Sequence, residues 1–105
     1  LGDRCTIDRV RCFYYNNSGV PVDIRVTLVR IDKSDGTTRA NVVTTTISTL
    51  GSEGVDNANL FAGQALDTDT YWYELEVEIV DQGTPLNDNF GIYGLSVRYE
   101  KSRVW

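Results

Sequence analysis

The chain has 105 residues, of which 15 are acidic and 10 are Lys or Arg, so its formal net charge is −5. This length is typical of a single domain, which we expect to span residues 1–105. The negative balance argues against nucleic acid as a partner, because binding to phosphates depends on Lys and Arg. No apolar run approaches the roughly 20 residues that a membrane-spanning helix needs, so we expect no membrane insertion. The absence of histidine excludes His-based catalytic triads and imidazole metal ligands.

Turn-forming segments divide the chain at short intervals. They are NNSG at 16–19, DKSDG at 32–36, GSEG at 51–54, DTDT at 67–70 and DQGTPLNDN at 81–89. The runs between them are rich in Val, Ile, Thr and Tyr, and no long run repeats apolar residues with the 3.6-residue period of a helix. The pattern predicts an all-β fold, an antiparallel two-sheet sandwich of six to eight strands that is jelly-roll-like in type.

The first two predicted strands, at 5–15 and 22–31, alternate between an apolar and a polar face. In the first strand, one face holds Val10, Cys12 and Tyr14, and the other holds Arg9, Arg11 and Phe13. In the second strand, the inward residues are Val22, Ile24, Val26 and Leu28, and the outward ones are Asp23, Arg25 and Thr27. Each strand therefore has an apolar face that a second sheet can cover.

The middle of the chain gives weaker signals. A threonine-rich element at 38–50 has an ambiguous phase, and residues 58–66 predict a weak strand or an irregular crossing. The run VVTTTISTL at 42–50 is strongly β-forming and uncharged, so at a sheet edge it would invite pairing with another chain. We expect it to be covered within the sandwich.

The last two strands are predicted at 71–80 and 90–100. The first of them has Tyr71, Tyr73, Leu75, Val77 and Ile79 inward and Trp72, Glu74, Glu76 and Glu78 outward. The second has Tyr93, Leu95, Val97 and Tyr99 inward and Ser96, Arg98 and Glu100 outward. Gly91 and Gly94 inside this strand predict a β-bulge, or else the close approach of a neighbouring subunit.

Three segments of the chain resemble a set of uncharacterised bacterial and phage-associated β-sandwich proteins. These segments are IDRVRCFYYNNSG at 7–19, VDIRVTLVRID at 22–32 and GIYGLSVRYE at 91–100. The resemblance covers most of the chain, and it implies a compact jelly-roll-like module that is exported or carried on a virion and is often oligomeric. It brings no catalytic residue, and it says nothing about Cys5 and Cys12.

The alternate glutamates Glu74, Glu76 and Glu78 first suggest an enzyme. ELEVE resembles the Glu-x-Asp-x-Glu strand motif of certain jelly-roll glycoside hydrolases, in which paired carboxylates act as nucleophile and acid. Here the middle residue is Glu rather than Asp, and the chain is short for a protein with a sugar cleft. We therefore expect no enzymatic activity.

Two other interpretations of the acidic residues stay open. Loops that flank the glutamate strand offer oxygen ligands for calcium, although ordinary Asx-rich turns are the simpler explanation. The residues concerned are Asp67, Asp69, Asp81, Asn87, Asp88 and Asn89. Alternatively, the glutamates form a charged outer ladder that is either solvated or met by outward arginines. The outward arginines are Arg9, Arg11, Arg25 and Arg98.

Cys5 and Cys12 are seven residues apart in one predicted strand, about 23 Å in an extended chain and too far for a disulfide. The odd spacing also places them on opposite faces, unless a bulge near Asp8 resets the phase. We expect Cys12 to be buried as a small apolar residue. Cys5 is then either a free thiol or, in an oxidising location, bonded to another copy of the chain.

An outward tryptophan such as Trp72 can anchor a protein interface or stack on a sugar. We expect a non-enzymatic structural module without cofactor or metal that assembles with other copies of itself into a homo-oligomer, virion component or extracellular filament. A carbohydrate-binding module is the alternative. The expected location is extracellular or on a virion surface. The candidate interface residues are Cys5, Arg9, Arg11, Trp72, Glu74, Glu76, Glu78, Arg98 and Trp105.

Overall fold

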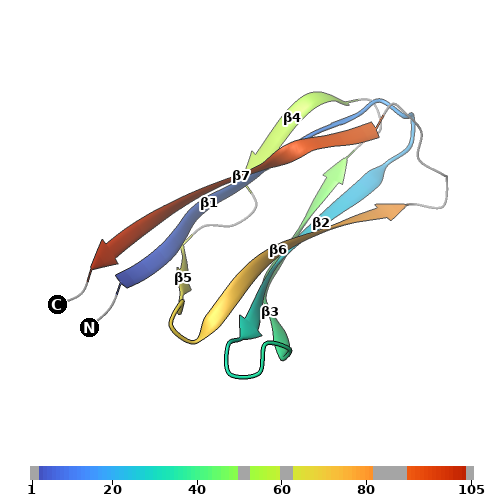
Figure 1. Ribbon diagram of the computed structural model, residues 1–105. Coiled ribbons are helices and arrows are strands. Elements are labelled where there is room, and N and C mark those ends of the chain that lie inside the picture. Colours follow the sequence, from blue (N-terminus) through green and yellow to red (C-terminus); the bar gives the residue numbers. More distant parts are fainter. Residues whose placement is uncertain (1–2, 50–52, 60–62, 82–89, 104–105) are drawn as a thin grey trace.

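The computed structural model (Figure 1) describes the backbone of residues 3–49, 53–59, 63–81 and 90–103, and the side chains of 5–49, 63–80 and 90–101. These residues form seven β-strands. The strands are β1 (Asp3–Asn16), β2 (Val22–Asp32), β3 (Arg39–Thr49), β4 (Glu53–Asn59), β5 (Gln64–Leu66), β6 (Tyr71–Asp81) and β7 (Phe90–Arg103). All strand pairs are antiparallel. The predicted all-β fold and the number of strands are confirmed.

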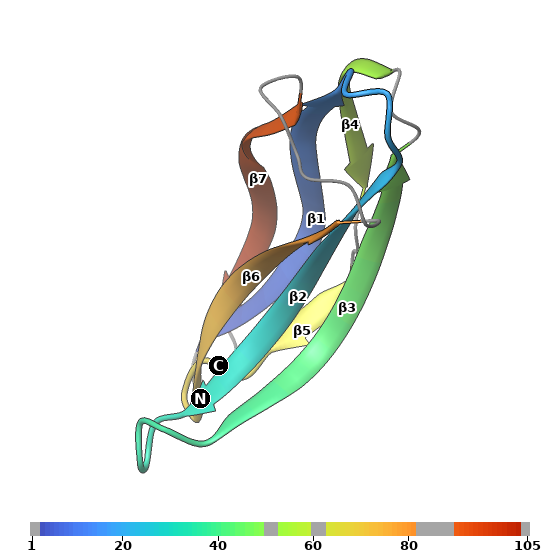
Figure 2. The same cartoon turned by 90° about the vertical axis from the view of Figure 1, so that its right-hand side faces the viewer.

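The strands form two sheets that pack face to face. In the β1 sheet, β1 pairs with β7 along one edge, while β4 and β5 share its other edge. In the β2 sheet, the order is β3-β2-β6. Figure 2 shows β6 and β7 along one side of the molecule, with β3, β4 and β5 toward the other. The β1–β2, β3–β4, β5–β6 and β6–β7 connections each pass from one sheet to the other, as expected of a jelly-roll-like sandwich.

The core lies between the two central strands, because among the described strands only β1 and β2 have a neighbour on both edges. Its buried residues are Ile7, Val10, Cys12, Tyr14, Ile24, Val26, Leu28 and Ile47. The inward faces predicted for 5–15 and 22–31 are therefore confirmed. Thr27 was expected to be solvent-exposed on the outer face, but it is buried, and its hydroxyl shares a 3.0 Å hydrogen bond with that of Thr44 on β3.

A bulge in β1 changes the relation between the two cysteines. The register with β7 shifts between Ile7 and Arg9, so Asp8 has no direct partner, and Ile7 and Val10 are both buried although they are three residues apart. The shift changes which side chains alternate between the two faces of β1, and it places Cys5 and Cys12 on the same face. Both are free thiols. Burial raises the pKa of the Cys12 thiol above its ordinary value.

A second bulge, in β7, confirms the prediction from the glycines. The register between β1 and β7 shifts at Tyr93, which is 65% exposed and stacks on Tyr15 with ring centroids 5.4 Å apart. The inward position predicted for Tyr93 is therefore wrong. Gly91 lies opposite Tyr15, and a Cβ at that position would come within 2.7 Å of the tyrosine ring. Any larger residue would require the Tyr15 ring to move.

The threonine-rich strand is not covered as expected. β3 lies at the edge of the β2 sheet, and among the described strands it pairs only with β2. A register shift leaves Val42 without a direct partner, and such a bulge is one way in which an edge strand resists pairing with other chains. The turn predicted at 51–54 is also wrong in part, because β4 begins at Glu53. The segment predicted at 58–66 contains the end of β4 and all of β5.

Buried polar groups join the β1–β2 turn to β3. The side-chain amide of Asn16, which is fully buried, donates hydrogen bonds to the carbonyl oxygen of Val20 at 2.9 Å and to Oγ1 of Thr49 at 2.8 Å. Its carbonyl oxygen accepts one from the backbone N–H of Ser18 at 3.1 Å. Thr49 Oγ1 in turn donates to the carbonyl oxygen of Val22 at 2.5 Å. This network fixes the chain where it crosses between the sheets.

Candidate interaction surfaces

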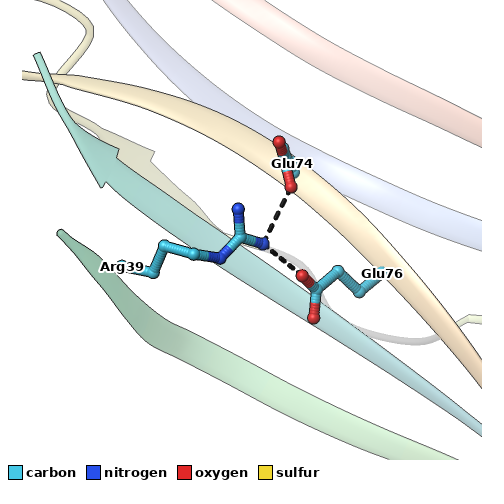
Figure 3. Close-up of polar contacts among 3 residues, drawn as sticks. All are labelled: Arg39, Glu74 and Glu76. Atoms are coloured by element: carbon cyan, nitrogen blue, oxygen red, sulfur yellow. Dashed lines mark hydrogen bonds and ion pairs between the residues drawn. The ribbon is translucent and has the colours of Figure 1, made fainter. Parts of the chain in front are cut away.

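The glutamate ladder (Glu74, Glu76 and Glu78) lies on the outer face of the β2 sheet, with all three side chains exposed. Arginines of the same sheet meet it. Arg39 of β3 extends across β2, where its Nη2 lies 2.9 Å from Glu74 and also bonds Glu76 (Figure 3). Arg25 of β2 lies 3.1 Å from Glu78. Of the interpretations above, the structure thus shows a charged ladder met by arginines.

The position of Arg39 follows from the pairing of strands. β3 and β6 flank β2, so their backbones are about 10 Å apart, which a long arginine side chain can span. Val29 of β2 pairs with Glu74 and is only 2% exposed although it is on the outer face, which we attribute to the stem of Arg39 crossing above it. The hydrogen bond that Arg39 donates to Glu74 raises the pKa of the Arg39 guanidinium above its ordinary value. Arg39 was not among the predicted residues, because the alternation of faces in its strand was ambiguous.

Three of the four predicted outward arginines lie on the opposite face of the molecule, whereas the fourth, Arg25, meets Glu78. Arg9, Arg11 and Arg98 are on the outer face of the β1 sheet, so within one chain they cannot reach the glutamate ladder. Arg9 and Arg98 are direct cross-strand neighbours, an unfavourable like-charge pair. The carboxylate of Asp8, at the bulge, accepts a hydrogen bond from Nε of Arg98 and offsets this repulsion. We call Arg9, Arg11 and Arg98 the arginine face.

An aromatic group lies where β6 begins, beside the β2–β3 turn. Trp72 is 52% exposed on the outer face, with Nζ of Lys33 5.9 Å from its ring centroid. Tyr71 lies on the inner face under the guanidinium of Arg30, at 4.6 Å. The turn is held by Asp35, and hydrogen bonds from the Thr38 hydroxyl and from the backbone N–H groups of Thr37 and Thr38 lower the pKa of its carboxyl to about 2. The carboxylate of Asp35 therefore stays charged, and able to accept these bonds, to a lower pH than an ordinary Asp does.

Four inward residues of the edge strands β6 and β7 are incompletely covered. Their exposed fractions are 39% for Val77, 41% for Ile79, 42% for Val97 and 62% for Tyr99. The predicted faces are right, since Ile79 pairs with buried Ile24 and Val97 with buried Val10. The residues are nevertheless partly exposed, because no further described strand lies beyond β6 or β7 to cover them. We call these four residues the open side.

The other residues predicted as metal ligands or interface residues form no additional cluster among the described residues. Among the residues that the structure describes, no group of three or more His, Cys, Asp or Glu could hold a metal ion. The side chain of Asp81 and the predicted ligands Asn87, Asp88 and Asn89 lie outside the described residues, as does Trp105. Cys5 is half-buried in the β1 sheet, opposite Leu66 of β5 and Lys101 of β7.

Comparison with known proteins adds no relative. No protein-family model matches the chain, no curated protein matches it, and no solved structure matches it. The described part of the chain has no helix that is both long and apolar enough to span a membrane. The candidate site therefore rests on the geometry of this chain alone.

Proposed function

We propose that this protein is a non-enzymatic assembly module that forms a homo-oligomer through the open side of its sandwich. The observation that supports this proposal is the contrast between the central and the edge strands. Inward residues of β1 and β2 are almost completely buried, whereas Val77, Ile79, Val97 and Tyr99 stay exposed on the same faces. Covering such apolar side chains with a second copy would remove them from water, which is the main driving force of association.

The arrangement of the glutamates supports a non-enzymatic role. Arg39 bonds both Glu74 and Glu76, and Arg25 bonds Glu78, so each carboxylate of the ladder is paired with a guanidinium of the same sheet, an arrangement that suits a structural role. The location expected for such a module, extracellular or on a virion, is part of the proposal and is supported by the resemblance to phage-associated sandwiches.

A lysine at Val97 tests the proposal, with Val42 as a matched control. Both are edge-strand valines of similar exposure, 42% and 37%, but Val42 lies at the β3 bulge, away from the open side. We expect Val97→Lys to weaken self-association at least tenfold, because it places a charge in the contact, and Val42→Lys to leave it unchanged. Sedimentation velocity over a range of concentrations measures both. Equal association of the two variants would contradict the assignment of the open side.

Carbohydrate binding is the second candidate, and the exposed ring of Trp72 favours it. An indole that is 52% exposed beside Lys33 and the Arg39–Glu74 pair offers both a stacking surface and hydrogen-bonding groups. If this function holds, a glycan array should give a ligand whose binding Trp72→Ala abolishes, and Tyr93→Ala, which removes an exposed aromatic from the other sheet, should leave that binding unchanged. An array without any ligand would count against it.

A further inference from the structure

The longest unpaired strand edge of the described structure belongs to β7. This strand has 14 residues and pairs with β1 on one edge, while no described strand pairs with its other edge. The free N–H and C=O groups of such an edge are a ready template for a strand of another chain. On β7 the inward Val97 and Tyr99 alternate with the outward Arg98 and Glu100, and all four side chains are exposed. This segment can therefore contribute both apolar and charged pairs.

The charges of β7 distinguish between the registers in which it can pair with itself. When two copies of β7 pair antiparallel, inward residues stay beside inward residues only if one residue lies directly opposite the same residue of the other copy. We say that such a register is centred on that residue. A register centred on Arg98 opposes two arginines, and one centred on Glu100 opposes two glutamates, so both are unfavourable. A register centred on Tyr99 places Arg98 opposite Glu100 of the second copy, and does so twice. A register centred on Val97 gives no opposite-charge pair.

The glutamate ladder disfavours self-pairing of β6 along the stretch that carries the glutamates. Because Glu74, Glu76 and Glu78 occupy alternate positions, every antiparallel self-pairing centred between residues 74 and 78 places a glutamate opposite a glutamate. Like charges directly opposite one another destabilise a strand pair. Of the two edge strands on the open side, β7 is thus the one whose charged stretch offers opposite-charge pairs with its own copy.

We infer that a second copy of this chain adds antiparallel along the free edge of β7, in the register centred on Tyr99. The inference rests on the proposed function, whose contact and symmetry it specifies. The contact joins Tyr99 to its own copy and forms two Arg98–Glu100 pairs related by a two-fold axis. Such an isologous contact closes at a dimer, so a filament would need a second contact elsewhere.

Cysteine cross-linking tests the register. In a Cys5→Ser background, with Cys12 buried, we expect Tyr99→Cys to form a disulfide-linked dimer rapidly under mild oxidation, because directly opposed residues lie within disulfide range. Val97→Cys is the matched control, since in this register the two copies of position 97 are about 14 Å apart. Non-reducing electrophoresis separates the outcomes. Cross-linking at position 97 but not at 99 would overturn the inferred register.

Charge reversal gives a second readout that does not depend on cysteine. Arg98→Glu alone and Glu100→Arg alone should each weaken dimerisation about tenfold, because each turns two attractive pairs into repulsive ones. The double variant should restore it. Arg98→Glu and the double variant both place a glutamate beside Asp8 and Arg9 within the chain, so these two contacts do not account for the recovery. An oligomer that is insensitive to both tests refutes pairing through β7 and leaves the proposed function standing, whereas a monomer at all concentrations refutes both.

Discussion

Replacing Ile24 with Ala is expected to lower the free energy of unfolding by about 3–4 kcal/mol, the usual cost of a cavity in a tightly packed core. Ile24 is completely buried on the central strand β2, and its direct partner on β6 is Ile79. The same change at Ile79, which is 41% exposed, should cost only about 1 kcal/mol in the monomer, because little packing is lost there. Urea unfolding at low protein concentration measures both values.

The two variants form a controlled comparison, since they change the same residue type at paired positions on one face of one sheet. Similar losses of stability would mean that β6 is covered as fully as β2, and the open side would not exist. The expected difference of about 2–3 kcal/mol would show that the core ends at the central strands.

The second large effect is expected at Asn16. Substitution by Ala removes the donors to Val20 and Thr49 and leaves buried acceptors without partners, so we expect a loss of about 2–3 kcal/mol. Neighbouring Asn17 is exposed in the same turn, and its replacement by Ala should change stability by less than about 0.5 kcal/mol. Thermal and urea unfolding of the two variants test this. A loss below 1 kcal/mol for Asn16→Ala would show that the turn is not tied to β3 by this network.

The alternation of apolar residues was sufficient to predict the strands and the inner faces of β1, β2 and β6. It failed at Tyr93, where one extra residue shifts the alternation of faces. It left the alternation open near Asp8 and at 38–50, where the structure has bulges at Asp8 and Val42. A bulge depends on how a strand fits its partner, so periodicity within one strand cannot locate it. The glycines at 91 and 94 were an exception, because they marked the bulge at Tyr93 in the sequence itself. The exposure of inward residues on β6 and β7 could not be predicted from alternation either, because it depends on what lies beyond the strand.

The residues of the candidate surfaces could be predicted from the sequence, but their contacts with one another could not. The glutamate ladder and the arginine face were both found from their alternation, yet the structure places them on opposite sheets. Arg39 was missed because its contact with Glu74 depends on β3 and β6 both flanking β2. The order of strands in a sheet is set by the whole chain, and neither charge nor periodicity at 38–50 contains that information.

The native mass of the unmodified chain in solution tests the central claim most directly. Light scattering after gel filtration, repeated over a range of concentrations and with and without reductant, should give a multiple of the 11.8 kDa chain mass that does not change with reductant. A mass that falls to that of one chain on reduction would assign assembly to intermolecular disulfides through Cys5. A mass of one chain at every concentration would contradict assembly altogether and would favour the carbohydrate-binding alternative.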